Sequence, residues 1–155
     1  MRAEPSQDQP FDAATLLRSV RRLEQRLSDS IDGALEEMGL TTSLYLSLEA
    51  LDREPRVHAS QLARNLGITR QSIHAVVAKL GAMDLVDLLP VDLGVRGLLL
   101  TDLGRRRLDL ARGAVQDVLA SLHRDLSPHE LDGLARLAER CVHALRPRPM
   151  RWWLD

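Results

Sequence analysis

Apolar residues recur with a helical period along most of this chain, and the first such run is the longest. Between residues 16 and 35, leucine, valine and isoleucine return at steps of three and four positions, with arginine and acidic residues between them. The pattern predicts a long amphipathic helix that begins near Phe11 and is closed by Gly39. A shorter helix comes next, and either Thr41 or Thr42 is suited to cap its start.

The most informative stretch, residues 57–86, combines two short helical patterns with a glycine between them. The first pattern spans 59–66 and the second spans 70–82, with Gly67 in the turn and Thr69 as the N-cap of the second helix. The second helix has one apolar side, which is formed by Ile73, Val76, Val77 and Leu80. Two helices joined by a glycine-containing turn of about three or four residues are typical of a helix-turn-helix.

After the second helix the pattern changes, and residues 85–100 are predicted to form a β-hairpin around a turn that contains proline and glycine. Thr101 caps another long helix, and a capping box with Ser127 and Glu130 starts the last one. The predicted fold class is mainly α (α+β). It is a winged helix-turn-helix with flanking N- and C-terminal dimerisation helices.

The terminal helices have apolar stripes that are longer than a small winged domain can cover. A second copy of the chain is the simplest cover for them, and a two-fold dimer suits DNA half-sites that repeat about one helical turn apart. The sequence therefore predicts a homodimer. Its interface is predicted to include Leu16, Val20, Leu23, Leu134, Cys141 and Leu145.

Composition narrows the class of protein without changing this picture. The chain has 155 residues, 45% hydrophobic and 28% charged, which suits a folded domain with its own core. No apolar run is long enough for a transmembrane span, and residues 1–10 lack the apolar segment of a secretory signal. Cys141 is the single cysteine, which fits a reducing compartment. These features predict a cytoplasmic protein with no membrane partner.

The formal net charge is −1, but its distribution along the chain is uneven. Residues 1–51 have a net charge of −4, residues 52–113 of +3 and residues 114–155 of 0. The electropositive third therefore contains the predicted helix-turn-helix and hairpin. The excess is small, so it supports DNA binding only together with the motif.

The polar start of the second helix is the predicted DNA-reading element, because it faces away from the apolar stripe. Arg70 can pair with guanine or phosphate, and Gln71 with adenine. Thr69 and Ser72 suit a phosphate at the helix N-terminus, and His74 lies one turn further on. The alternative interpretation is a solvated helix start.

Further basic and polar positions extend this predicted interface. Ser60 and its neighbour Gln61 begin the preceding helix, where they contact backbone phosphates or are solvated. Lys79, the only lysine, is predicted to reach phosphates from a later turn of the reading helix. The arginine run 105–107 comes after the hairpin and is either a solvated face or a source of one phosphate contact.

The segment LARNLGITRQSIHAVVAKLGAMDLV, the hairpin and LLLTDLGRRRL together resemble the MarR family of bacterial transcriptional regulators. The resemblance covers about residues 11–145. It implies a homodimeric repressor that binds double-stranded DNA at a pseudo-palindromic operator and is released by a small lipophilic or phenolic ligand. It also implies one MarR-like unit over 11–146, with dimerisation helices at 11–39 and 102–146 and the winged helix-turn-helix at 41–101. Residues 1–10 and 147–155 are then tails.

The hairpin, or wing, departs from the family pattern. Asp92 occupies the acidic position, but Leu93 and Gly94 stand where the family has basic residues, and Arg96 falls two positions later. Arg96 either reaches the minor groove or pairs with Asp92. The apolar wing favours modest DNA affinity. It also supports a second hypothesis, in which the dimer is a protein-interaction module with weak or lost specific DNA binding.

The resemblance places an effector pocket between the dimerisation helices and the winged lobe. Arg22, Arg26, Tyr45 and Leu48 come from the corresponding elements, although a solvated face also explains the arginines. Cys141 lies on the apolar stripe of the last helix, where a buried structural thiol is expected rather than a redox sensor. Trp152 and Trp153 belong to the C-terminal tail, and their role is left open.

No catalytic or metal-binding motif is present in the sequence. The five histidines form no HExxH pattern, and no CxxC pair, phosphate-binding glycine loop or nucleophile elbow with triad partners occurs. The sequence therefore predicts no enzyme activity, no metal and no cofactor.

Overall fold

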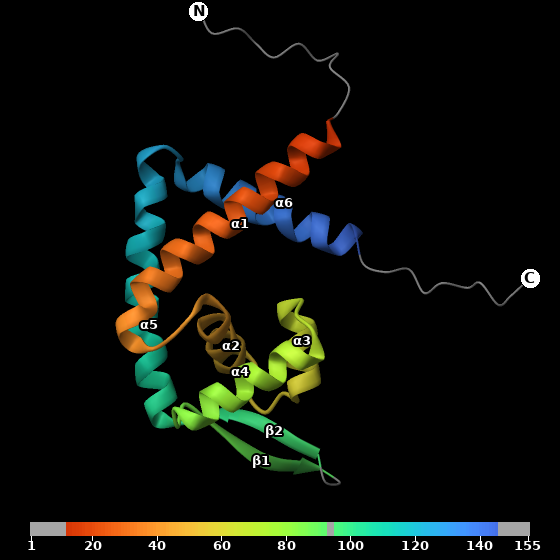
Figure 1. Cartoon of the computed structure of the whole chain (residues 1–155), viewed down its shortest axis with the longest axis vertical. Coiled ribbons are helices and arrows are strands. Elements are labelled where there is room, and N and C mark those ends of the chain that lie inside the picture. The colour runs from red at the N-terminus through yellow and green to blue at the C-terminus, as the bar shows by residue number, and fades with distance from the viewer. Residues whose placement is uncertain (1–11, 93–94, 146–155) are drawn as a thin grey trace, which may run out of the picture. The chain divides into compact units, whose positions relative to one another are not determined.

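The structure is a computed structural model, and it describes residues 12–92 and 95–145 (Figure 1). The chain divides into two compact units, with the boundary between Gln116 and Asp117 inside a long helix. The first unit holds a helical lobe with one antiparallel hairpin, and the second holds the end of the long helix and the last two helical elements. The elements in order are α1 (Ala13–Leu35), η1 (Glu36–Met38), α2 (Thr42–Arg53), α3 (Ala59–Leu66), α4 (Arg70–Ala82), β1 (Val86–Asp92), β2 (Val95–Leu100), α5 (Asp102–Ala120), η2 (Ser121–Arg124) and α6 (Pro128–Ala144).

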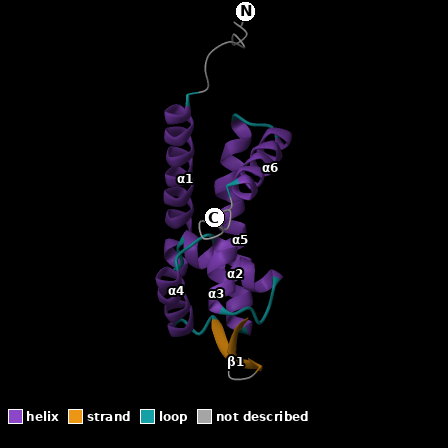
Figure 2. Cartoon of the chain, turned by 90° about the vertical axis from the view of Figure 1, so that its right-hand side faces the viewer, coloured by secondary structure: helices purple, strands orange, loops and turns teal. Residues whose placement is uncertain are grey.

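The predicted fold class is confirmed: the described residues are mainly helical, with a two-stranded sheet after the helix-turn-helix. The bounds of α3 and α4 equal those predicted from the sequence. In Figure 2 the two strands extend beyond the helices of the first unit, as a wing does.

Helix starts obey the local capping signals in the sequence. The side chains of Asp12, Thr41 and Thr69 each accept a backbone N–H from the first turn of α1, α2 and α4. Ser127 and Glu130 form the predicted capping box of α6. These bonds satisfy N–H groups that a helix start leaves without partners, so the starts of α1, α2, α4 and α6 are set by the local sequence.

The turn between α3 and α4 depends on Gly67. Its φ angle is 66°, a left-handed conformation that glycine adopts without the steric cost of a Cβ atom. Its N–H donates to carbonyl oxygens of the last turn of α3. The turn ends α3 and lets α4 begin three residues later.

The wing is an antiparallel hairpin whose register pairs Val86 with Leu100 and Leu88 with Leu98. The other edge of β2 also bonds to the chain before α3. The N–H of Arg56 donates to the carbonyl of Leu98 at 2.9 Å, and the N–H of Leu98 donates to the carbonyl of Val57 at 2.9 Å. The wing is therefore tied by backbone bonds to the residues that precede the helix-turn-helix.

The core of the first unit lies where α2, α3, α4, the wing and α5 meet. Leucine side chains dominate it, and burial of this apolar surface is the main term that stabilises the lobe. The most deeply buried side chains are Leu35, Leu48, Leu51, Leu62, Ile73, Leu80, Leu85, Leu98, Leu100 and Leu108.

The last helix, α6, leaves most of its apolar side chains exposed. In α6, Leu134 is 43% exposed and Leu145 is 81% exposed. Cys141 is also exposed, so the prediction of a buried thiol is wrong for the single chain. The apolar stripe that suggested burial exists, but no described residue of this chain covers it. Within the described residues, no helix is long and apolar enough to cross a membrane.

Candidate nucleic-acid interface

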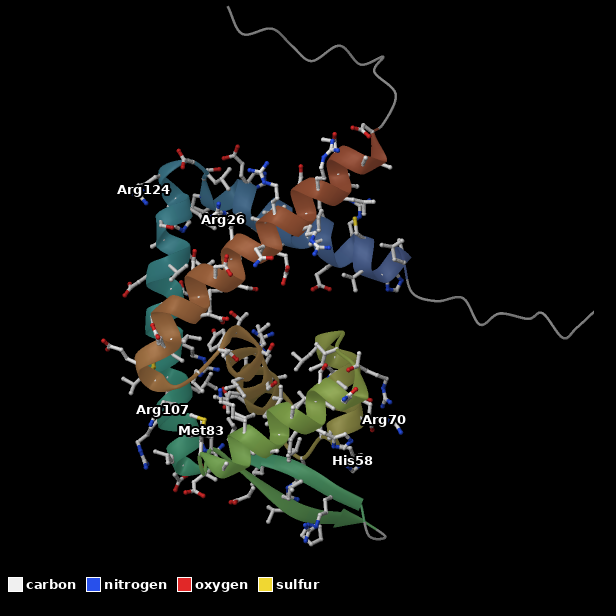
Figure 3. All side chains as sticks on the ribbon, viewed as in Figure 1. Arg26, His58, Arg70, Met83, Arg107 and Arg124 are labelled. Atoms are coloured by element: carbon white, nitrogen blue, oxygen red, sulfur yellow. The ribbon has the colours of Figure 1, made fainter. Side chains whose placement is uncertain are left out.

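Helix α4 has two distinct faces. Ile73 and Leu80 are completely buried against the lobe, and the two valines between them are half-buried. Arg70, Gln71 and His74 are exposed on the other face. The helix contains no acidic residue. The structure thus places the predicted reading residues on one accessible, non-acidic surface, which starts at Arg70 (Figure 3).

The start of α4 is held by two hydroxyl groups. Thr69 Oγ1 accepts the N–H of Ser72 at 3.1 Å, and the two side-chain hydroxyl oxygens lie 2.8 Å apart. Both residues are exposed. This arrangement fixes the first turn, so Arg70 and Gln71 project from a rigid helix end.

The first turn of α3 offers fewer unengaged polar side chains for phosphate contacts than the sequence predicted. Ser60 is half-buried. Gln61 is engaged inside its own helix: its amide donates to Asn65 at 2.7 Å and accepts from Arg64 at 2.6 Å. Ser60 therefore remains the more available of these two predicted phosphate contacts.

Arg96 is exposed on β2, opposite Pro90 in the hairpin register. Its carbonyl oxygen lies 3.1 Å from Nδ1 of His58, the residue just before α3. The sequence left Asp92 as an alternative partner of Arg96, but the Asp92 side chain lies outside the described part of the structure. Leu93 and Gly94 also lie outside it. The wing residues Leu88 and Leu89 are 46% and 38% exposed, so the described wing surface is apolar as well as basic.

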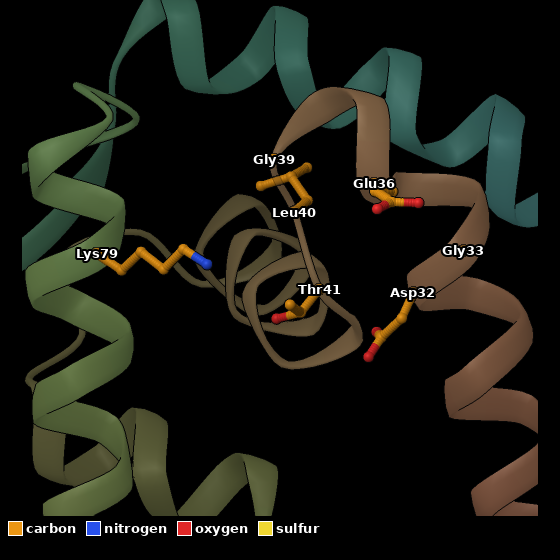
Figure 4. Close-up of a pocket in the computed structure, with 7 residues that line it drawn as sticks. All are labelled: Asp32, Gly33, Glu36, Gly39, Leu40, Thr41 and Lys79. Carbon is orange, nitrogen blue, oxygen red and sulfur yellow. The ribbon is translucent and has the colours of Figure 1, made fainter.

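Lys79 extends from α4 toward the N-terminal end of α2 (Figure 4). There it lines a cavity of about 440 Å³ together with residues of α1 and of the α1–α2 connection, namely Asp32, Gly33, Glu36, Gly39, Leu40 and Thr41. Asp32 accepts bonds from the N–H and hydroxyl of Thr42 at 2.6 and 2.7 Å, so it joins α1 to the start of α2. Lys79 thus shares the lining of this cavity with the carboxylates of Asp32 and Glu36.

The four residues predicted to bind a ligand are not among the residues that line this cavity. Arg22 and Arg26 are exposed on α1. Leu48 is completely buried in the core, and Tyr45 donates its hydroxyl to Glu49 at 2.8 Å. In this arrangement of the chain, the α2 residues of the predicted pocket are therefore engaged within the fold.

Tyr45 belongs to an ion-pair network that the sequence did not reveal. Arg112 of α5 reaches both carboxylate oxygens of Glu49, at 2.9 and 3.1 Å, and Asp52 at 2.6 Å. Burial and the bond to Glu49 raise the pKa of Tyr45 to about 12. The bonds from Arg112 hold the pKa of Glu49 below its usual value. The network fastens α2 to α5, elements about 60 residues apart in the sequence.

The arginine run after the wing is divided between structural and exposed positions. Arg107 donates to the carbonyl oxygen of Met38 at 2.7 Å and is half-buried. Arg105 pairs with Asp102 at 3.8 Å, and Arg106 is exposed. Arg107 therefore links α5 to the end of η1, and a phosphate contact from this run is left to its two neighbours.

The predicted dimerisation surface of α1 is exposed in the single chain. Leu16 is 48%, Val20 is 57% and Leu23 is 39% exposed. Together with Leu134, Cys141 and Leu145 of α6, all six predicted interface residues are accessible. Among the described residues, no three His, Cys, Asp or Glu side chains gather as a metal site would require.

Comparison with known families and solved structures shows what the chain is similar to. A model of the MarR family matches residues 38–97, from η1 to the second wing strand. No curated protein matches the chain. Escherichia coli MarR in its apo form is similar in structure, with 17% identity and a TM-score of 0.69 over 86% of this chain and 98% of that one.

The MarR family protein Rv2887 of Mycobacterium tuberculosis is another similar structure. It is 25% identical, with a TM-score of 0.63 over 84% of this chain and 95% of its own. The same protein in complex with DNA matches with 23% identity and a TM-score of 0.65, over 85% of this chain and 98% of that one. It has also been solved with salicylic acid, with 24% identity and a TM-score of 0.65 over 85% and 97% of the two chains.

Proposed function

We propose that the chain is a winged-helix transcriptional regulator of the MarR family, whose model matches residues 38–97, and that it reads a specific double-stranded DNA sequence through α4. The observation that carries this proposal is the exposed, non-acidic face of α4 that begins at Arg70 and Gln71. A recognition helix contacts base edges with its N-terminal residues, and the capped start of α4 presents these two side chains there. The complex of Rv2887 with DNA is a precedent for this activity on a similar fold.

In this proposal Thr69, Ser72 and Ser60 contact phosphates, and His74 extends the reading face. Arg96 of the wing reaches the adjacent minor groove, as its exposure on β2 allows. Lys79 shifts between a phosphate and the cavity that it lines with α1.

The active form is a homodimer on a pseudo-palindromic operator. The exposed apolar residues of α1 and α6 support this state. When a partner covers a leucine that is half exposed in the single chain, the burial stabilises the dimer by about 1 kcal/mol. In this proposal residues 11–146 of each chain form one subunit of the dimer. The dimer acts in the cytoplasm, where its DNA is.

We further propose that the protein is a repressor released by a small lipophilic or phenolic effector. The Rv2887 structure with salicylic acid shows that a similar fold accommodates such a ligand. Arg22 and Arg26 are exposed on α1 and suit an anionic group, while Tyr45 and Leu48 become available only if α2 shifts.

The deciding experiment measures binding to the DNA upstream of the protein's own gene. Fluorescence anisotropy with that duplex and with a scrambled duplex of equal length gives the specificity ratio, and a salt series gives the number of phosphates neutralised. We expect tighter binding to the upstream duplex. Equal, weak binding to both duplexes at low salt contradicts a specific regulator.

A second candidate function is that of a protein-interaction module, which the exposed Leu88 and Leu89 of the wing favour. A solvent-facing apolar wing suits a protein partner better than a phosphate backbone. In that case Leu88→Ser leaves DNA binding unchanged and abolishes a protein complex. The DNA-binding proposal instead predicts no stable complex with the wing.

A further inference from the structure

One histidine joins the helix-turn-helix to the wing. Nδ1 of His58 lies 3.1 Å from the backbone carbonyl oxygen of Arg96, which is 38 residues away. A carbonyl oxygen can only accept a hydrogen bond, so Nδ1 must carry the proton of this contact. The bond therefore selects the ring orientation and the protonated nitrogen.

The position of His58 between α3 and the wing suits a contact with the DNA backbone in the proposed complex. It is the N-cap residue of α3, and its side chain makes no capping bond to that helix. The first helix of a helix-turn-helix crosses the DNA backbone, and a wing reaches phosphates. His58 lies where these two elements meet, at the end of the lobe that also holds Arg70 (Figure 3).

The contact with Arg96 decides what the second ring nitrogen can do. When the ring is neutral and Nδ1 holds the proton, Nε2 has only a lone pair. A phosphate oxygen is also an acceptor, so the neutral ring and a phosphate repel each other. Only the imidazolium can donate from Nε2 to a phosphate while Nδ1 still donates to Arg96.

The charged groups of the elements around His58 are mostly basic. The adjoining elements are the loop before α3, α3 itself, the start of α4, and the wing. Their basic groups are Arg56, Arg64, Arg70, His74 and Arg96, and their acids are Glu54, Asp87 and Asp92. Glu54 already accepts a bond from Asn65 at 3.4 Å. The arginines outnumber the acids in these elements, which suits a polyanionic partner such as DNA.

We infer that His58 is a phosphate-binding residue of the DNA interface and that DNA binding takes up one proton at each His58. This inference rests on the proposed DNA-binding function. Its consequence is a DNA affinity that falls as the pH rises through the range in which histidine loses its charge.

Two substitutions separate the phosphate contact from the link to the wing. In His58→Asn, the short amide places a donor near the position of Nδ1 and keeps the bond to Arg96, but nothing replaces Nε2. In His58→Gln, the longer amide places an uncharged donor near the position of Nε2. A purely structural role is rescued by asparagine, whereas a phosphate contact is not.

The test measures the dissociation constant for the upstream duplex between pH 6.0 and 8.5 at constant ionic strength. As the pH rises, the affinity of the wild type for this duplex should fall by at most about tenfold per pH unit for each proton taken up. His58→Asn should bind on the order of tenfold more weakly at pH 6.0 and lose the pH dependence. His58→Gln should also bind independently of pH, and thermal melts check that both variants fold.

His74→Gln is the matched control, because His74 is the exposed histidine of α4. It should keep the wild-type pH dependence even where its affinity drops. The inference is overturned if the pH dependence of binding is lost in His74→Gln but kept in His58→Gln. It is also overturned if His58→Asn binds with wild-type affinity.

Specific binding by the wild type that does not change with pH overturns only the inference about His58. If the wild type shows no specific binding at any pH, the proposed function is overturned as well.

Discussion

Gly104, in the first turn of α5, lies so close to Leu85 that a Cβ atom on the glycine would overlap the carbonyl oxygen of Leu85. The same atom would lie 3.0 Å from the carbonyl carbon, and neither is part of a flexible side chain. That carbonyl also accepts the N–H of Thr101 at 3.1 Å, while the Thr101 hydroxyl accepts the N–H of Gly104 at 2.9 Å. The glycine therefore allows α5 to pack directly on the backbone that leads into the wing.

Gly104→Ala should destabilise the protein by at least about 2 kcal/mol, because a backbone must move to admit the methyl group. The matched control is Gly113→Ala in the same helix, where an added Cβ meets nothing within 4 Å. That variant should gain up to about 1 kcal/mol from helix propensity. Urea unfolding followed by circular dichroism measures both values. Equal stability of the two variants would contradict the close packing of α5 on Leu85.

Tyr45 should titrate abnormally. It is the only tyrosine, so absorbance at about 295 nm reports its ionisation without interference from another phenol. We expect a pKa of about 12 in the folded protein, because burial and the bond to Glu49 favour the neutral phenol. In urea the midpoint should return to about 10. Because the folded pKa is the higher one, its stabilisation is complete below about pH 10 and is lost as the pH rises toward 12.

The network around Arg112 should also appear in the acid unfolding profile. The pKa of Glu49 is lowered in the folded state, first by the bond from Arg112. Its stabilisation is therefore present above the unfolded value of about 4.3 and is lost as the pH falls through the lower folded value. Arg112→Met should make stability less dependent on pH in this acid range, as measured by urea unfolding between about pH 3 and 6. Arg136→Met, which breaks only an exposed pair with Asp132 within α6, should keep the wild-type profile.

Arg70→Ala should weaken binding to the specific duplex by about 1–3 kcal/mol and should relax the preference for one base pair. The control is Arg124→Ala, which removes the same charge from η2, where Arg124 bonds only within its own turn in the described contacts. The ratio of specific to scrambled binding should be unchanged in Arg124→Ala, because Arg124 is not part of the proposed reading helix. A specificity ratio that is unchanged by Arg70→Ala would remove this residue from the reading face.

Leu23→Glu should convert the dimer to a monomer or weaken it strongly. The substitution places a charge in the middle of the exposed apolar surface of α1, where a partner would have to bury it. Gln25→Glu adds the same charge to an exposed position of the same helix and should leave the assembly intact. Analytical ultracentrifugation over a concentration series distinguishes the states. A monomeric wild-type protein would refute the dimer directly.

Much of the fold was predictable because its signals are local. The period of the apolar residues, the glycine turn and the hydroxyl or carboxylate caps each act within about one helical turn, so a window of sequence contains both partners. This is why α3 and α4 begin and end where expected, and why Arg70 and Gln71 lie on the exposed face of α4.

The errors and omissions concern partners that are distant in the sequence or absent from the chain. Cys141 lies on an apolar stripe, but no described residue of this chain covers it, so periodicity alone could not reveal its exposure. Leu48 and Tyr45 are on the expected helix, but their neighbours on other elements engage them. Lys79 is on the expected surface, yet its reach toward α1 depends on how two helices pack.

By itself, the sequence determined the succession of elements, the winged helix-turn-helix and the polar start of the reading helix, because short-range hydrogen bonds and side-chain period specify them. Only the tertiary structure decided which polar groups meet over long distances in the sequence. Arg112 binds the carboxylate of Glu49, Arg107 binds the backbone carbonyl of Met38, and His58 binds the backbone carbonyl of Arg96, across 38 to 69 residues. Groups so far apart in the chain have no local pattern in common, and packing of the leucine core is what brings them within hydrogen-bond distance.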